Sequence, residues 1–176
     1  MALFQGKYKP RNPEKYVDQN GLNDICFRSS WEKSVMIFLD NNIRVKKWGS
    51  EVVVIPYINA NDGKVHRYFM DFYVEFTNGN KLLIEVKPFV QTQTPQKTPR
   101  KRVARYLEEC KTYATNLSKW DSAKRWAKAH GMKFQIWTEK ELQKLGISLI
   151  TSKKFRYVNY GSTKRTRKGS SKNKNS

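Results

Sequence analysis

Three charged side chains, Asp71, Glu85 and Lys87, interrupt two runs of alternating apolar residues that flank an Asn-Gly turn, in the stretch YFMDFYVEFTNGNKLLIEVKP at residues 68–88. Residues two apart on a strand share a face, so Glu85 and Lys87 should project together. If Asp71 joins them, the two carboxylates could hold a divalent metal ion, because Mg²⁺ prefers oxygen ligands. The alternative is an ordinary solvated hairpin face whose charges form cross-strand salt pairs.

The length of the turn decides whether Asp71 and Glu85 share that face. A two-residue loop over Asn78 and Gly79 would place the carboxylates on opposite faces of the sheet. A three-residue loop that begins at Thr77, with Gly79 in the left-handed conformation of a bulge, pairs Asp71 with Glu85. It also pairs apolar residues with one another, Met70 with Val86, Phe72 with Ile84 and Val74 with Leu82, and it places Glu75 opposite Lys81. We predict the three-residue loop, because burial requires matched apolar faces.

In that register the Cβ atoms of the two acids lie about 5 Å apart. Such a like-charge pair is unfavourable unless a positive charge lies between its members, so we predict a site for Mg²⁺, or for Mn²⁺ in its place. Lys87 would orient the attacking water or stabilise the developing charge on a phosphate. The acid-x-Lys triplet alone is uninformative, because it occurs three times, at Asp62, Glu85 and Glu109. What selects Glu85 is its apolar strand opposite a strand that contains an aspartate.

A helix should precede these strands. Apolar residues recur at helical spacing in RSSWEKSVMIFLDNN, and Ser29 with Glu32 fits a capping box that marks the helix start. Glu32 therefore has two interpretations that the pattern leaves open. It is either a capping residue with no further role, or a ligand that the helix aims at the metal.

The remaining elements follow from periodicity and turn residues. We predict strands at 51–58, 65–76 and 81–87, a loop at 88–101, helices at 103–117 and 118–131, a strand at 133–137 and a short capped helix that ends at Gly146. The order is helix, three-stranded antiparallel meander, helices, further strand, helix. This is an α/β domain, with flexible basic termini on either side.

Composition divides the chain into a basic N-terminal arm at 1–25, a domain at 26–147 and a basic tail at 148–176. The segment from Thr151 onward has nine Lys or Arg and no acid, and we expect it to be disordered. This tail would act as a plain electrostatic tether, or its three aromatic residues would stack on bases. They are Phe155, Tyr157 and Tyr160.

The overall charge points to a polyanionic partner. The chain has 35 Lys and Arg against 15 Asp and Glu, a formal charge of +20, which favours nucleic acid over an anionic membrane surface. No apolar run approaches the roughly 20 residues of a spanning helix. The N-terminus lacks the apolar stretch of a signal peptide, and two cysteines are too few for a disulfide framework, so we expect an intracellular protein.

These residues, in this order, resemble the PD-(D/E)xK nuclease superfamily, which has a restriction-endonuclease-like core. The resemblance maps the first acid of the motif onto Asp71 and the acid-x-Lys triplet onto Glu85, Val86 and Lys87. It maps the glutamate that the first helix often supplies onto Glu32. The proline that usually precedes the first acid is replaced here by methionine.

Longer segments such as GKYKPRNPEKY, WGSEVVVIPY and SKWDSAKRWAKAHGMKFQIWTEKEL resemble the head completion nucleases of T-even-type tailed phages, over about residues 5–147. TnsA-type transposon-end endonucleases are similar more distantly. The resemblance implies a Mg²⁺-dependent DNA endonuclease with catalytic Glu32, Asp71, Glu85 and Lys87. The metal ligands would be Asp71, Glu85, the Val86 carbonyl and Glu32.

The resemblance also implies a biological setting. The enzyme would trim or process packaged double-stranded DNA at the portal before the neck and tail attach, without a nucleotide cofactor or a membrane. Its protein partners would be phage head, portal or neck proteins, in the virion or the infected host cytoplasm. Two alternatives stand beside this one. A basic DNA-binding structural head or neck protein with a degenerate nuclease site would share its charge and fold. A sequence-specific restriction enzyme is disfavoured, because the chain lacks room for a separate recognition domain.

Overall fold

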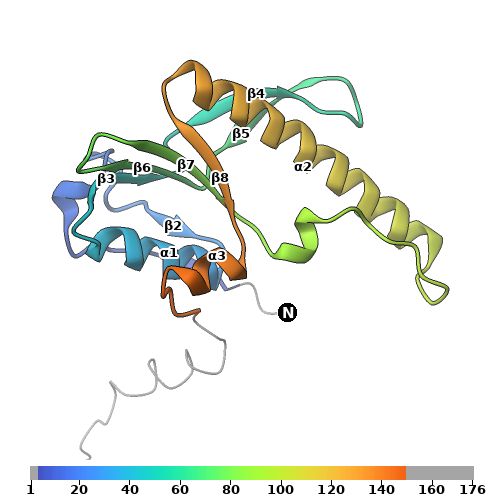
Figure 1. The fold of residues 1–176 in the computed structure, drawn as a ribbon, viewed down its shortest axis with the longest axis horizontal. Coiled ribbons are helices and arrows are strands. Elements are labelled where there is room, and N and C mark those ends of the chain that lie inside the picture. The colour runs from blue at the N-terminus through green and yellow to red at the C-terminus, as the bar shows by residue number, and fades with distance from the viewer. Residues whose placement is uncertain (1–3, 150–176) are drawn as a thin grey trace, which may run out of the picture.

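The computed structural model describes residues 4–149 (Figure 1). The helices are α1 (Ser30–Asn41), α2 (Val103–Ala129) and α3 (Glu139–Lys144), with single 3-10 turns η1 (Pro13–Lys15) and η2 (Phe89–Thr92). The strands are β1 (Gly6–Lys7), β2 (Cys26–Phe27), β3 (Val45–Ser50), β4 (Val54–Ile58), β5 (Val65–Phe69), β6 (Phe72–Phe76), β7 (Lys81–Val86) and β8 (Lys133–Trp137).

A four-stranded sheet in the order β3-β6-β7-β8 forms the centre of the molecule. Strands β3, β6 and β7 are antiparallel, and β8 runs parallel to β7. Strands β4 and β5 form a separate hairpin, inserted in the chain between β3 and β6, that packs against α2 (Figure 1). The predicted α/β class is therefore confirmed.

The two faces of the sheet are covered by different helices, and the alternation along β7 follows this division. Leu82, Ile84 and Val86 belong to the apolar cluster that includes side chains of α1 and α3. Leu83 belongs to the second cluster, with Ala123 of α2 and side chains of the β4–β5 hairpin. Because Glu85 lies two residues after Leu83 on the same strand, it shares the α2 face.

Three elements differ from the sequence prediction. Strand β3 was not predicted, because VKKWGS lacks a regular apolar alternation, yet it takes the place of the first meander strand beside β6. The predicted strand 65–76 is divided into β5 and β6 by Met70 and Asp71. The two predicted helices are one continuous α2. Ser118, which we expected to open the second helix, donates its hydroxyl within the helix to the Ala114 carbonyl at 3.1 Å.

The N-terminal segment is packed rather than flexible over residues 4–25. Tyr8 and Tyr16 are buried in the α1 cluster. The fully buried Asp40 carboxylate accepts hydrogen bonds from the Tyr8 hydroxyl at 3.1 Å and from the amides of Arg11 at 2.7 Å and Asn12 at 3.1 Å. The polar composition suggested a free arm, but a few aromatic anchors and one satisfied buried carboxylate are enough to hold it in place.

The register of the β6–β7 hairpin agrees with the three-residue loop. Gly79 has a φ of +83°, in the left-handed region that glycine adopts without strain. The predicted pairs that lie within both strands are confirmed: Phe72 with Ile84, Val74 with Leu82, and Glu75 with Lys81. Met70 is a correction: we expected it on the Phe72 face, but it packs in the α2 cluster beside Leu83, because the strand breaks after Phe69.

The basic tail lies outside the described residues apart from positions 148 and 149, and so do Phe155, Tyr157 and Tyr160. Within residues 4–149, none of the helices combines the length and the apolar character that crossing a bilayer requires.

Candidate active site

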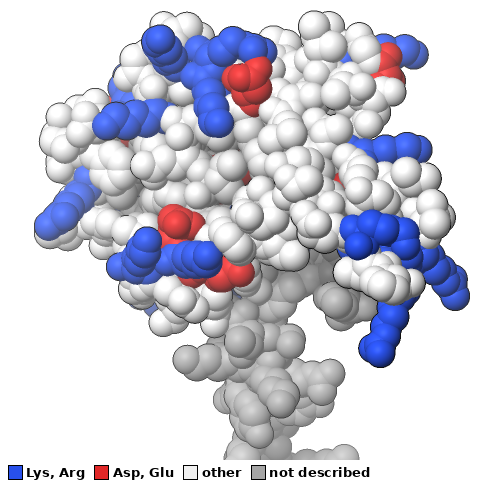
Figure 2. All heavy atoms as spheres, turned by 45° about the vertical axis from the view of Figure 1, so that its right-hand side comes forward, with Lys and Arg blue, Asp and Glu red and all other residues white. Residues whose placement is uncertain are grey.

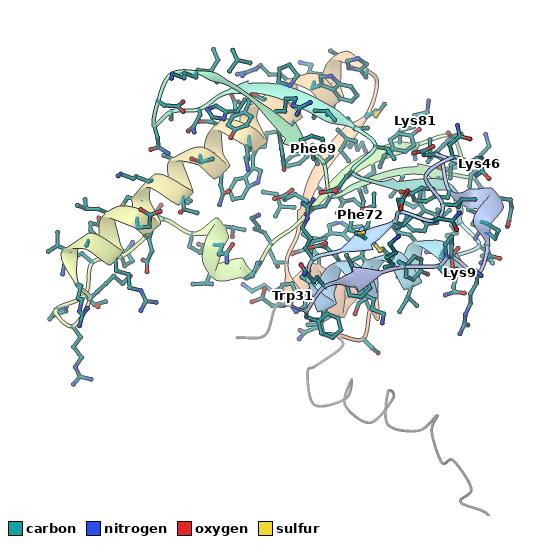
Figure 3. The ribbon with its side chains drawn as sticks, turned by 180° about the vertical axis from the view of Figure 1, so that it is seen from behind. Lys9, Trp31, Lys46, Phe69, Phe72 and Lys81 are labelled. Carbon is teal, nitrogen blue, oxygen red and sulfur yellow. The ribbon has the colours of Figure 1, made fainter. Side chains whose placement is uncertain are left out.

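Asp71 lies in the break between β5 and β6, which Phe69 and Phe72 flank (Figure 3). Here the main chain leaves the β6–β7 ladder. The side chain of Asp71 replaces a main-chain carbonyl as the acceptor, and its Oδ2 accepts a hydrogen bond from the Val86 amide at 2.7 Å. The break therefore holds the carboxylate at the point where β7 ends.

Glu85 is a buried acid on β7, with 3% of its surface exposed. Its Oε2 accepts a hydrogen bond from the Tyr68 hydroxyl at 2.7 Å, and its Oε1 forms an ion pair with Lys87 Nζ at 3.0 Å. Buried carboxylates are tolerated only when paired in this way. The structure thus brings Asp71, Glu85 and Lys87 together, with Asp71 held by its hydrogen bond to the Val86 amide rather than as a ladder partner of Glu85.

Two carboxylates lie close together in this cluster, and the pKa of Asp71 reflects their repulsion. Burial and the neighbouring Glu85 carboxylate raise the pKa of Asp71 well above its usual value, against the opposing effects of the Val86 amide and Lys87. Burial also works against the charged form of Lys87. The carboxylates of Glu85, Asp71 and Glu32 outweigh that effect and raise the pKa of Lys87 above its usual value. Lys87 is therefore a cation at neutral pH.

Such a pair suits a divalent cation, which would relieve the repulsion that disfavours ionised Asp71 beside Glu85. The fit is limited to two carboxylates. Across residues 4–149, no three His, Cys, Asp or Glu side chains are grouped so that they could hold a metal ion. Main-chain oxygen and water would have to complete the coordination shell, as they commonly do for Mg²⁺. The carbonyl of Val86, between Glu85 and Lys87, is the nearest main-chain candidate in sequence.

Glu32 lies near the pair, but its carboxylate is engaged in capping α1. Oε2 accepts from the Arg28 amide at 2.7 Å and Oε1 from the Ser29 hydroxyl at 2.8 Å, while Ser29 Oγ accepts from the Glu32 amide at 3.1 Å. The capping interpretation is thereby supported by direct contacts. Glu32 nonetheless contributes to the raised pKa of Asp71, so its charge is felt at the site.

Two further side chains at the site were not predicted from the sequence. Tyr68 projects onto Glu85 from β5, and burial together with the Glu85 carboxylate raises its pKa, so it remains a hydrogen-bond donor. Lys119 projects from α2, and burial and then the charge of Lys87 lower its pKa. Alternation along one continuous strand 65–76 would put Tyr68 on the face away from Asp71. The contact between Tyr68 and Glu85 could not be predicted, because the sequence pattern does not reveal the break between β5 and β6.

Positive charge is distributed around the molecule. Figure 2 shows Lys and Arg side chains around the periphery of one face, with smaller groups of Asp and Glu among them. Some of the described cations are neutralised, as in the pairs Arg28–Glu51 at 2.6 Å and Lys46–Glu75 at 2.8 Å.

Comparison with known proteins extends the picture from the site to the whole chain. Residues 42–139 match the family model described as TnsA-like endonuclease N terminal, a range that includes Asp71, Glu85 and Lys87 and begins after Glu32. The chain is 39% identical over 146 residues to the head completion nuclease of Enterobacteria phage T4, covering 81% of this chain and 96% of that protein. No solved structure matches the chain. The chain therefore belongs to the family of phage head completion nucleases and contains a TnsA-like endonuclease N-terminal domain.

Proposed function

We propose that this protein is a Mg²⁺-dependent endonuclease that hydrolyses double-stranded DNA in phage head completion. The observation that supports this proposal most strongly is the convergence of Asp71 and Glu85 beside Lys87 at the end of β7. The family supports the reaction class, because the T4 relative is named a nuclease and the matched domain is described as an endonuclease.

Asp71, Glu85 and the Val86 carbonyl would hold the metal ion, and Glu32 would act through water or help to hold a second ion. When bound, the ion would polarise a phosphoryl oxygen and neutralise charge as it develops. Mn²⁺ should substitute for Mg²⁺, since both accept carboxylate, carbonyl and water oxygen.

Lys87 would contribute a fixed positive charge to the reacting phosphate and would position the attacking water. In the hydrolysis, the water oxygen forms a bond to phosphorus while the bond from phosphorus to one sugar oxygen breaks. The water gives up one proton to solvent, and the leaving sugar oxygen gains one. The products are a phosphate-terminated strand and a hydroxyl-terminated strand.

The excess of Lys and Arg would provide sequence-independent affinity for the DNA backbone. Because such binding releases counterions, it should weaken steeply as salt rises. The substrate would be the packaged DNA end at the portal, trimmed or processed before the neck and tail attach. The name of the T4 relative, which the match covers over 96% of its length, supports a role in head completion. The protein partners would be head, portal or neck proteins, in the virion or the infected host cytoplasm.

Removal of divalent metal tests this proposal. Purified protein is expected to nick and linearise supercoiled plasmid in Mg²⁺ or Mn²⁺. EDTA should stop the reaction, and excess Mg²⁺ should restore it, because two buried carboxylates cannot activate the phosphate by themselves. The measurement is gel quantification of plasmid forms over time.

Retention of DNA on a filter at low salt serves as the control, and it should persist in EDTA because it depends on Lys and Arg. Cleavage that continues undiminished in EDTA would contradict the metal-dependent mechanism. Retention of DNA with no cleavage in any metal would favour the alternative, a structural DNA-binding head protein.

A further inference from the structure

Helix α2 places a lysine at the edge of its buried face, next to the candidate active site. Helix α2 contacts strand β4, and its buried residues are Asn116, Trp120, Ser122, Ala123 and Ala127. Lys119 lies one residue before Trp120 and is half-buried. Its position on a packed helix restricts where its ammonium group can go.

Two tyrosine rings hold that ammonium group. Lys119 Nζ lies 5.3 Å from the centre of the Tyr68 ring and 5.7 Å from the centre of the Tyr57 ring. Both distances are within the range of cation–π attraction. The hydroxyl of Tyr68 donates to Glu85 at 2.7 Å, so a single side chain separates Lys119 from the acidic pair.

Lys119 combines partial burial with the lack of an acidic partner among residues 4–149, unlike Lys87 and Lys101, which are also partly buried. Lys87 pairs with Glu85 at 3.0 Å and Lys101 with Glu109 at 2.7 Å. Within residues 4–149, no ion pair or hydrogen bond from Lys119 Nζ is found. A half-buried ammonium group loses hydration, and two aromatic faces replace only part of it. This cation is therefore available to an anion that enters the site.

The reacting phosphate is such an anion. Lys87 is already neutralised in part by Glu85, so a phosphate at the Asp71–Glu85 pair would benefit from a second positive charge. A lysine ammonium group offers three rotatable donors, which suits a phosphate oxygen whose position changes during the reaction. We propose that Lys119 is a second phosphate-binding lysine of this active site, contacting the scissile DNA phosphate from α2. This inference rests on the proposed nuclease function.

Replacing Lys119 by methionine tests the role of the charge while keeping the alkyl chain over Tyr68. The cleavage rate of bound DNA is expected to fall about 10- to 100-fold, because one preorganised contact to the transition state is lost. Lys119→Arg should retain most of the rate. The rates are measured as single turnovers of a duplex in Mg²⁺, with the enzyme in excess and the salt concentration fixed.

Lys124→Met is the matched control, since Lys124 is an exposed lysine of the same helix. It should change the rate less than about twofold and reduce DNA affinity only as any surface charge would. Melting temperatures of all variants are compared, because Lys119 also packs on aromatic rings. If Lys119→Met fails to fold, the comparison between Lys119→Gln and Lys119→Arg decides in the same way.

A Lys119→Met enzyme that cuts at the wild-type rate would overturn this inference. Equal losses in Lys119→Met and Lys119→Arg would also overturn it, since they would indicate a packing role. Neither result would contradict the proposed function. That function requires only that wild-type cleavage depends on Mg²⁺ and that Glu85→Ala abolishes it. A wild-type protein that never cuts DNA would overturn both.

Discussion

Replacing Asp71 or Glu85 by alanine should reduce Mg²⁺-supported DNA cleavage about a thousandfold or more. Each substitution removes one of the two carboxylates that would hold the metal ion, and with it the neutralisation of charge on the reacting phosphate. A loss of that size corresponds to about 4 kcal/mol of transition-state stabilisation. The measurement is the single-turnover cleavage rate in Mg²⁺, alongside DNA retention at low salt, which should be nearly unchanged.

Glu109→Ala is the matched control for these two variants. Glu109 also belongs to an acid-x-Lys triplet, but it is paired with Lys101 and Arg105 at the start of α2, away from the acidic pair. Its replacement should leave the cleavage rate within about twofold of wild type. Wild-type rates in both Asp71→Ala and Glu85→Ala would contradict the assignment of this site.

A conservative variant separates loss of chemistry from loss of folding. Because the folded state raises the pKa of Asp71, the ionised carboxylate makes the metal-free protein less stable as pH rises above the ordinary aspartate pKa. Asp71→Asn removes that charge and keeps an oxygen that can accept from the Val86 amide. This inactive variant should therefore melt at or above the wild-type temperature in EDTA at neutral pH.

The second large effect is expected at Lys87. Lys87→Ala removes the cation that lies 3.0 Å from Glu85, so the reacting phosphate loses a fixed positive charge and the attacking water loses a positioning group. The cleavage rate should fall about 100- to 1000-fold, while Mn²⁺ still binds because both carboxylates remain. Single-turnover kinetics with a parallel Mn²⁺ titration measure the two effects separately.

Lys81→Ala provides the comparison on the same strand. Lys81 is exposed at the opposite end of β7, so its replacement should alter DNA affinity slightly and the rate of bound DNA hardly at all. A Lys87→Ala variant that cuts as fast as Lys81→Ala would show that the lysine has no part in the chemistry.

The acidic pair could be predicted from the sequence because burial determines register. Only the three-residue loop matched apolar residues across the hairpin, and the pairing of Phe72 with Ile84 bears this out. The break at Met70 could not be predicted, because alternation counted through 65–76 assumes one continuous strand. That break turns Met70 toward the α2 cluster and allows Tyr68 to reach Glu85.

Other features depend on tertiary contacts that local patterns do not encode. Strand β3 has a weak apolar alternation and owes its place to pairing with β6. The N-terminal segment looks polar throughout, yet Asp40 and a few aromatic residues fix it to the core. Lys119 appears as an ordinary helix lysine until α2 is known to be continuous and packed on Tyr57 and Tyr68. The same capping pattern allowed Glu32 to be either a capping residue or a metal ligand. Its carboxylate makes the contacts of a capping residue, with the Arg28 amide and the Ser29 hydroxyl.

The most direct measurement of the central claim is Mn²⁺ binding followed by electron paramagnetic resonance, in the absence of DNA. The wild-type protein should bind Mn²⁺ specifically, and Glu109→Ala should bind it equally well. Asp71→Asn and Glu85→Gln should each lose that binding, because one remaining carboxylate holds the ion too weakly. Unchanged Mn²⁺ affinity in both variants would contradict a metal centre at the end of β7.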